Sequence, residues 1–348
     1  MKTKSITIEI SGKCNAKCPY CAQFRLKQDN HFGEIMSPIL FEQILDHLFK
    51  IGIINKNDPP TISLFNWGDP FLNPKINDIL QILKNKKLTA VISSNFIVVP
   101  NIDKKLLSVI DRVTFSLSGF SQASYGRIHG GSLNKVFNNF DNFYESIRKY
   151  SPKTKIVISW HRYLFNENEF WDAYKKFNLP GISIDPIIAY LNDGVKIRDF
   201  LKGELSEDYI KKAEKDVFLD FIKKSMVSNK KKSKNYYCPQ WDSIVIDESG
   251  QLLLCCCVTR YDSDSVLGNI LDMSSEEILN RNLDNSLCNE CISLGIARFV
   301  QNPDTSIPSG GGLYSLKWKF YLKFRKTIGP ILVKSPYGRK IISIINNL

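Results

Sequence analysis

Six short apolar runs alternate with helical patterns over the first 190 or so residues of the chain. Each run is rich in β-branched residues and ends in a small or polar cluster. Because strands that alternate with helices of about ten or more residues form βαβ units, the pattern predicts a parallel α/β sheet. The predicted strands are 6–10, 61–66, 90–95, 112–118, 155–161 and 181–186. Eight units would close a full barrel, so six predict a partial, TIM-like (β/α)6 barrel or an open doubly wound sheet, and we favour the partial barrel.

The predicted helices carry readable start signals. Residues 37–52 begin with Ser37 as a cap, followed by proline at the first helical position. Residues 73–85 repeat this design with Asn73 as the cap. Residues 206–229 are predicted to form one long helix.

The composition is that of a globular protein. Hydrophobic residues make up 43% and charged residues 24% of the 348 residues, which argues against wholesale disorder. The N-terminus lacks the apolar region of a signal peptide, and no uncharged apolar run reaches the ~18 residues that span a bilayer. We therefore expect a cytoplasmic, reducing location, where nine cysteines are metal ligands or reactive thiols rather than disulfides.

Three of these cysteines stand close together after the first predicted strand. Cys14, Cys18 and Cys21 lie in the sequence CNAKCPYC. A structural zinc site would require a fourth ligand nearby. An iron–sulfur cubane has four irons, so three thiolates hold three of them and leave one open for chemistry.

The motif resembles the CxxxCxxC signature of the radical S-adenosylmethionine (SAM) superfamily, with the aromatic Tyr20 before the third cysteine. The resemblance implies a 4Fe-4S cluster whose open iron binds SAM. It also implies reductive cleavage of SAM to a 5′-deoxyadenosyl radical that abstracts hydrogen from a substrate.

Later strand ends resemble further motifs of the same superfamily. Trp67, Gly68 and Asp69 precede a proline in a stretch similar to GGEP, with aspartate in place of the usual glutamate. Two further stretches, ISSNF and SLSGFSQASYGRIHGG, resemble the STNG and SLDG regions, although phenylalanine replaces glycine in the first. The resemblance implies that all these residues contact SAM: Tyr20, Trp67, Gly68, Asp69, Ser93, Asn95, Ser116 and Arg127.

Two readings stay open for some of these positions. Arg127 suits a planar carboxylate, but a surface salt bridge would also explain it. His161 and Arg162, at the end of the fifth predicted strand, could bind substrate or be satisfied polar residues at the barrel rim.

A second cysteine group follows a different spacing. It resembles the SPASM or twitch extension of radical SAM enzymes, with a following LGNI and a late CxxC. The resemblance implies a second, auxiliary 4Fe-4S cluster held by Cys238, Cys255, Cys288 and Cys291. Zinc is the alternative, which iron and sulfide analysis would decide. The ESG sequence between these cysteines predicts a β-hairpin.

Cys255, Cys256 and Cys257 are consecutive, which leaves the choice of ligand open. The spacing from a preceding glycine favours Cys255, with Cys256 next. The thiols among these three that do not bind the cluster could simply be buried, packing as small hydrophobic side chains. Alternatively, Cys256 or Cys257 could donate a hydrogen atom to a substrate radical, which would make the enzyme an epimerase.

These features predict four regions. They are a radical SAM partial barrel (1–205), a helical linker (206–235), an auxiliary iron–sulfur domain (236–300) and a basic amphipathic tail (301–348). From residue 305 onward there are eight basic residues and no acidic one, within a formal net charge of +12. The tail could dock over the barrel or lie at an anionic membrane surface, which would place the enzyme peripherally at the inner membrane, and nucleic acid ranks third.

We predict a two-electron oxidation of a small molecule or carbohydrate, with SAM as co-substrate and a flavodoxin or ferredoxin as electron donor. The alternatives are epimerisation, modification of a peptide or protein, and an electron-transfer protein without substrate chemistry. Thirteen residues before Cys14 cannot hold a leader-recognition domain, which shifts weight away from peptide substrates.

Overall fold

A computed structural model describes residues 5–231, 236–262, 264–281 and 285–301. The predicted basic tail lies outside the described residues, apart from its first position. Within the described part of the chain, no helix is both long and apolar enough to cross a membrane.

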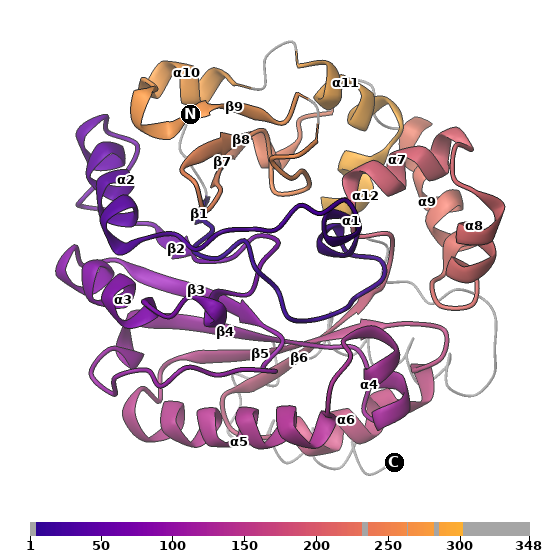
Figure 1. Ribbon diagram of the computed structural model, residues 1–348, viewed down its shortest axis with the longest axis horizontal. Coiled ribbons are helices and arrows are strands. Elements are labelled where there is room, and N and C mark those ends of the chain that lie inside the picture. The colour runs from indigo at the N-terminus through magenta and orange to yellow at the C-terminus, as the bar shows by residue number, and fades with distance from the viewer. Residues whose placement is uncertain (1–4, 232–235, 263, 282–284, 302–348) are drawn as a thin grey trace, which may run out of the picture. The chain divides into compact units, whose positions relative to one another are not determined.

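The six predicted strands form one parallel arrangement (Figure 1). They pair in sequence order, each with the next, so that β1 and β6 lie at the two ends of this parallel set. A doubly wound sheet reverses its strand order at a switch point, whereas this order runs one way. The partial-barrel prediction is therefore confirmed. The bounds are β1 (Ser5–Ile8), β2 (Thr61–Ser63), β3 (Thr89–Ser94), β4 (Ile110–Leu117), β5 (Lys155–Arg162) and β6 (Ile182–Ile188).

Helices connect these strands and cover the outer face of the sheet. Figure 1 shows α2 and α3 beside β1 to β3, and α5 and α6 beside β4 to β6. Along β5 the alternation is clear, since Ile158 and Trp160 are fully buried under helices while Ser159 and His161 face inward and are partly exposed. The helices are α1 (Ala22–Gln28), α2 (Pro38–Lys50), α3 (Ile76–Asn85), α4 (Gln122–Ile128), α5 (Leu133–Tyr150), α6 (Phe170–Phe177), α7 (Gly194–Lys202), α8 (Glu207–Ala213), α9 (Leu219–Lys231), α10 (Ser275–Asn280), α11 (Ser286–Ser293) and α12 (Ile296–Gln301).

One predicted helix start is confirmed and the other is wrong. The Ser37 hydroxyl accepts a hydrogen bond from the backbone N–H of Leu40, as a cap should. Asn73 instead lies before the start of α3, in a fully buried position. Its amide nitrogen donates to the carbonyl oxygens of Ile10 and Met36, and its Oδ1 accepts from the backbone N–H of Lys75, so tertiary contacts and a local turn together determine its place.

The predicted long helix over 206–229 is also wrong, because the chain breaks between α8 and α9. At the break, the buried Asp216 accepts a backbone hydrogen bond from Leu164 through its carbonyl oxygen. The helical period continues across the break in sequence, so the pattern alone could not reveal it.

The cysteine-rich region extends the same sheet. The strands are β7 (Ser243–Ile246), β8 (Gln251–Leu253) and β9 (Val266–Asn269). β7 pairs in parallel with β1, and β8 and β9 follow in antiparallel order, which confirms the predicted hairpin. The described residues form one compact unit, and the predicted boundaries at 205 and 235 stay predictions.

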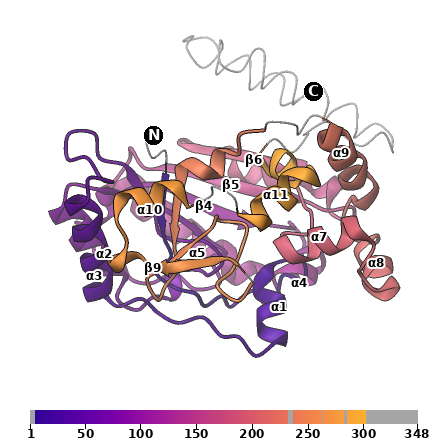
Figure 2. The same cartoon turned by 90° about the horizontal axis from the view of Figure 1, so that it is seen from above.

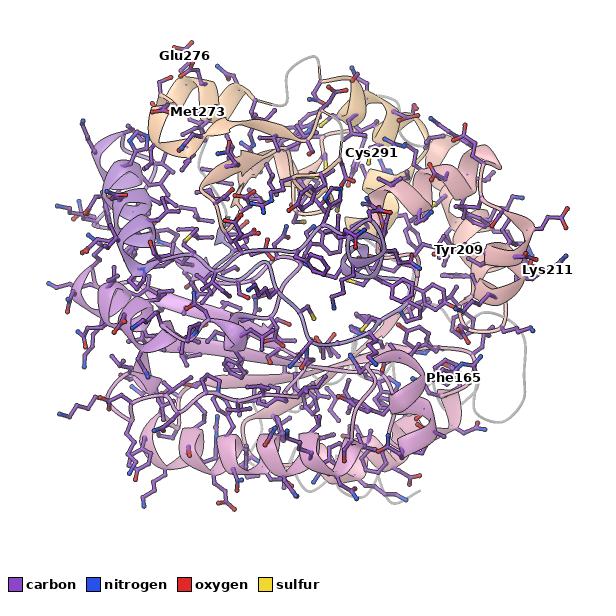
Figure 3. The ribbon with its side chains drawn as sticks, viewed as in Figure 1. Phe165, Tyr209, Lys211, Met273, Glu276 and Cys291 are labelled. Atoms are coloured by element: carbon purple, nitrogen blue, oxygen red, sulfur yellow. The ribbon has the colours of Figure 1, made fainter. Side chains whose placement is uncertain are left out.

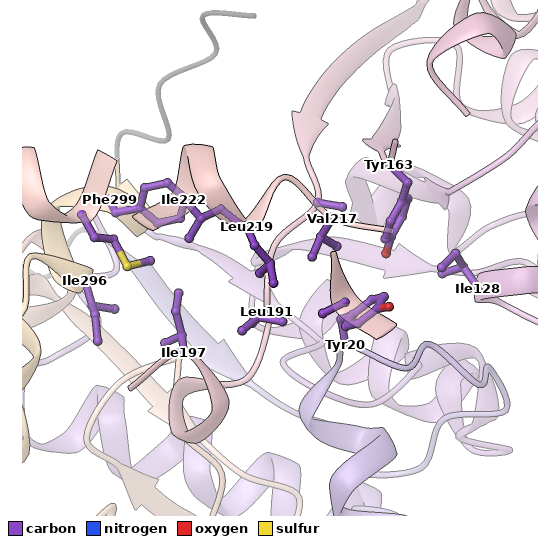
Figure 4. Close-up of a cluster of buried hydrophobic side chains, with 13 residues drawn as sticks. Tyr20, Ile128, Tyr163, Leu191, Ile197, Val217, Leu219, Ile222, Ile296 and Phe299 are labelled. Carbon is purple, nitrogen blue, oxygen red and sulfur yellow. The ribbon is translucent and has the colours of Figure 1, made fainter. Parts of the chain in front are cut away.

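An apolar cluster packs beside residues 14–21, the segment with the first three cysteines, which we call the cysteine loop (Figure 4). Tyr20 contributes from that loop, while Leu191, Leu219 and Phe299 come from segments far along the chain. The cluster therefore fixes the loop that carries Cys18 and Cys21 against α7, α9 and α12.

Candidate functional site

A cavity of about 420 Å³ opens at the carboxyl ends of the parallel strands. Carboxyl ends of parallel strands meet at one edge, which is why residues distant in sequence assemble there. The cavity brings together the three cysteines of the first group and every residue predicted to contact SAM except Arg127. These are Cys14, Cys18, Tyr20, Cys21, Trp67, Gly68, Asp69, Ser93, Asn95 and Ser116.

The thiols of the cysteine loop lie among polar neighbours. Asn95 donates to the Cys14 sulfur at 3.7 Å, and the Cys18 sulfur lies 3.4 Å from Nδ1 of His129. Lys27 holds the loop backbone by donating to the carbonyl oxygens of Cys14 and Ala16.

The donor set of this loop fits an iron–sulfur cluster. Burial raises the pKa of Cys21 to about 12, so coordination to a metal is what would ionise these thiols. Among the described residues, no three His, Cys, Asp or Glu side chains gather as a single ion requires. A cluster spreads its ligands further apart, because each thiolate binds a different iron.

The backbone at the end of β2 is held by a residue that the sequence analysis missed. The carboxylate of Glu9 accepts hydrogen bonds from the backbone N–H groups of Trp67 and Gly68, at 2.7 and 2.5 Å. A Cβ on Gly68 would lie 1.9 Å from the carbonyl oxygen of Ser11, so glycine is required there. A glutamate between isoleucines in a buried strand was the available signal.

Glu9 gives a pH-dependent prediction. Burial, and then the nearby Glu248 carboxylate, raise its pKa from about 4.5 to about 8. The folded state therefore keeps a proton that the unfolded chain loses, and the contribution of Glu9 to stability falls as pH rises from about 4.5 to about 8. The expected slope is at most about 1.4 kcal/mol per pH unit. Urea denaturation at several pH values in this range gives the free energy of unfolding as a function of pH. For Glu9→Gln, which keeps an acceptor oxygen, this free energy should change less with pH than it does for the wild type.

The control is Glu276→Gln, the same chemical change at an exposed position of α10 (Figure 3). This variant should keep the wild-type pH profile. If the free energy of unfolding changed equally with pH in the wild type and in Glu9→Gln, the raised pKa of Glu9 would be contradicted.

Asp69 ties the ends of β2 and β3 together. Its carboxylate accepts from the backbone N–H groups of Phe71 and Asn95 and from the Ser94 hydroxyl, each at 3.0 Å. Burial raises its pKa to about 6. These bonds hold Asn95 at the cavity, so aspartate serves as a backbone clamp where the related motif has glutamate.

The turn after β3 adopts the conformation that favours glycine. Phe96 has φ of 58° and its ring is fully buried among Phe71, Phe115 and Phe140. The left-handed backbone costs about 1–3 kcal/mol, and burial of the ring offsets that cost. The substitution of glycine by phenylalanine therefore preserves the turn.

Arg127 points to a different partner in this structure. Its guanidinium forms an ion pair with the buried Asp216 and lies 4.5 Å from the centre of the Phe165 ring. The hydroxyl of Tyr20 also donates to Asp216. Asp216, at the break between α8 and α9, therefore contacts both Arg127 and the cysteine loop. Contact of Arg127 with SAM stays a prediction.

Replacing Asp216 with alanine should destabilise the protein by about 1–3 kcal/mol, because the Tyr20 hydroxyl loses its acceptor in a buried position. Asp216→Asn keeps an acceptor and should lose less. The half-exposed Arg127 adds little to either loss. Chemical denaturation of both variants measures the effect, and an alanine variant as stable as wild type would refute this role.

The floor of the cavity is polar and carries no charge. Thr114, Ser116, Ser159 and His161 line it from β4 and β5. Burial lowers the pKa of His161 to about 4, so the imidazole is neutral near pH 7. Among the described residues that line the cavity there is no lysine or arginine. Arg162 faces away from the inner side of β5 and forms an ion pair with Glu167.

A second, mainly apolar cavity of about 70 Å³ lies in the C-terminal region. Five cysteines line it: Cys238, Cys255, Cys257, Cys288 and Cys291. Burial, together with the nearby Cys255 and Cys288, raises the pKa of Cys238 to about 11. Burial also raises the pKa of Cys291, as do Cys255, Cys238 and Cys288 in that order, and all four line this cavity.

Among the three consecutive cysteines, Cys256 points elsewhere. Its sulfur donates to Oε1 of Gln240 at 3.2 Å and lies 4.0 Å from the Cys257 sulfur. Cys257 lines the second cavity, but the thiols of Cys238, Cys288 and Cys291 have Cys255 as their common neighbour.

Residues that line the two cavities are in direct contact. Trp67, which lines the first cavity, donates from Nε1 to the carbonyl oxygen of Val258 at 2.8 Å. The amide of Asn66, in the orientation that satisfies both of its groups, donates to the Cys256 carbonyl oxygen at 3.2 Å. Tyr190 also lines the first cavity, and its pKa is raised by burial and then by Cys257 and Cys256.

Comparison with known proteins agrees with this geometry. Residues 8–185 match the radical SAM superfamily. A relative described as a probable GTP 3′,8-cyclase, from Methanococcus aeolicus, is 25% identical over 226 residues, which cover 63% of this chain and 71% of that protein. A second protein with this description, from Methanococcus maripaludis, is 25% identical over 136 residues, or 38% of this chain and 43% of that one.

Two solved structures share the fold. SuiB from Streptococcus suis bound to S-adenosylmethionine gives a TM-score of 0.51 at 15% identity, covering 86% of this chain and 72% of that chain. Native anSMEcpe with bound AdoMet gives 0.51 at 17% identity, covering 99% of both chains.

Proposed function

The chain belongs to the radical SAM superfamily, and from this premise we propose that it oxidises a neutral, hydroxylated small molecule or carbohydrate by two electrons. The observation that carries this proposal is the uncharged polar floor of the first cavity, beside a second cavity lined by cysteines.

The residues of the first cavity would hold a 4Fe-4S cluster and SAM. Cys14, Cys18 and Cys21 supply the thiolates, and Asp69 keeps the backbone at the ends of β2 and β3 in place. When bound, such a cluster supplies the single electron that cleaves SAM to methionine and a 5′-deoxyadenosyl radical. The apolar neighbours of the cysteine loop, including Tyr163, exclude water from this side.

The lining of the cavity favours a neutral substrate. Hydroxyl groups of Thr114 and Ser159 and the neutral imidazole of His161 can donate to and accept from substrate hydroxyls. The GTP of the curated relatives carries a triphosphate, which requires cationic partners. Because no lysine or arginine is among the described lining residues, a nucleoside triphosphate fits less well than a sugar-like molecule.

The second cavity would hold an auxiliary 4Fe-4S cluster that accepts the second substrate electron. Cys238, Cys255, Cys288 and Cys291 provide four thiolates, which fill a cubane and leave no open iron. Since Trp67 of the first cavity is hydrogen-bonded to Val258 of the second, an electron has a short path between them. Neither Cys256 nor Cys257 is among the described residues that line the first cavity, whereas Tyr190, whose pKa both thiols raise, does line it. This favours oxidation over epimerisation.

Deuterium transfer tests the substrate class. The reconstituted, reduced protein is incubated with SAM and with panels of deuterated sugars or alditols, of GTP, and of peptides. We expect deuterium in 5′-deoxyadenosine, and a product two hydrogens lighter, only from the neutral panel. Transfer from GTP or a peptide alone would refute the proposed substrate class.

A further inference from the structure

A third pocket, of about 210 Å³, lies on the side of the cysteine loop that faces away from the first cavity. Pro19, Tyr20 and Cys21 line it, together with residues of α1, α7 and α8, which lie side by side in Figures 1 and 2. Tyr20 and Cys21 also line the first cavity. The cysteine loop is therefore the wall between the first cavity and this pocket, which we call the loop pocket.

The rim of the loop pocket is positively charged. Its charged residues are Arg25, Lys196 and Lys212 against one carboxylate, Asp193. Arg25 is already paired with Asp193 and Asp262. Of the carboxylates that the structure describes, none lies within ion-pair distance of Lys196 or Lys212, so these two charges are available to a partner.

The chain around the pocket reinforces this charge. Residues 11–28, which include the cysteine loop and α1, contain four basic residues and no acidic one. Phe24 and Tyr209 add aromatic surface, with the Lys196 ammonium 5.5 Å from the centre of the Tyr209 ring. Aromatic side chains are enriched in protein interfaces, and the lysines favour a partner of opposite charge.

We propose that the loop pocket is the docking surface for a small acidic protein that carries one electron, of the flavodoxin or ferredoxin class. This rests on the proposed function, which requires one electron from outside for the cleavage of SAM. In the transfer the carrier loses one electron and the cluster site gains it, while no bond breaks or forms. Because electron transfer weakens steeply with distance, a surface that shares Tyr20 and Cys21 with the first cavity is a favoured place to dock.

The complementary charges should act mainly on the association rate. In the double variant Lys196→Glu/Lys212→Glu, we expect kcat/KM for reduced flavodoxin, measured by 5′-deoxyadenosine formation, to fall by about tenfold or more. The rate with dithionite should not change, since this small reductant needs no docking surface. Added salt should slow the flavodoxin reaction of the wild type and have little effect on the variant.

Lys211→Glu is the matched control. Lys211 and Tyr209 extend to different sides of α8 (Figure 3), and Lys211 pairs with Glu207 instead of lining the pocket. This variant should keep the wild-type rate with both reductants.

Three outcomes would overturn the proposal. A double variant that keeps the wild-type rate with flavodoxin excludes docking at these lysines. Equal losses with flavodoxin and dithionite would mean that the lysines act on the loop itself. A wild-type protein that forms no 5′-deoxyadenosine even with dithionite would overturn both this proposal and the proposed function, whereas the first two outcomes leave the proposed function intact.

Discussion

Replacing Cys18 with alanine should abolish 5′-deoxyadenosine formation and remove about half of the iron, while the fold is retained. Cys18 lies between Cys14 and Cys21 in the loop, and each thiolate is needed for a different iron of the cluster. The remaining iron should stay at the second cavity, because its four thiolates come from residues 238–291. Iron and sulfide analysis and chromatographic assay of 5′-deoxyadenosine with SAM and dithionite measure the effect.

The matched control for this variant is Cys256→Ala. Cys256 is also partly buried, but its sulfur bonds to Gln240 and it does not line either cavity among the described residues. It should keep the full iron content and full 5′-deoxyadenosine formation. Retained SAM cleavage in Cys18→Ala would contradict the assigned role of the loop.

Replacing Cys288 with alanine should impair the auxiliary cluster site and leave the SAM-binding cluster site intact. The protein should lose the auxiliary iron but still cleave SAM, because the first cavity is intact. Deuterium should still pass from substrate to 5′-deoxyadenosine, but no two-electron oxidised product should accumulate, since the substrate radical has no acceptor for its second electron. Mass spectrometry of product and 5′-deoxyadenosine in one reaction separates the two steps.

The same assay on single alanine variants of Cys256 and Cys257 decides between oxidation and epimerisation. We expect both to form full product. Loss of product in either one, with SAM cleavage retained, would favour a hydrogen-donating thiol. Normal oxidation by Cys288→Ala would contradict electron return through the second cavity.

The parts of the fold that follow from local patterns were predictable. Each of the six parallel strands lies within a few residues of an apolar run, because a strand buried by helices must be apolar on its covered face. The cysteine motif identified the cavity because its spacing is carried by a short segment, and strand order then brought Ser93 and Ser116 to the same edge.

The remainder depends on contacts between distant segments. The pairing of β7 with β1 joins residues more than two hundred positions apart, and no local pattern encodes it. Asp216 looked like one more residue of an amphipathic helix, although its carboxylate is what Tyr20 and Arg127 require. Glu9 appeared as a polar residue in a strand, and its role became visible only with the backbone of Trp67 beside it.

The most direct test is electron paramagnetic resonance of the reduced protein before and after addition of SAM. In the proposed enzyme, one cluster site has an open iron and the other is complete. We therefore predict two cluster signals, of which SAM changes only the one that is absent in Cys18→Ala. A response to SAM of the signal that remains in that variant, or a single signal lost in both Cys18→Ala and Cys288→Ala, would contradict it.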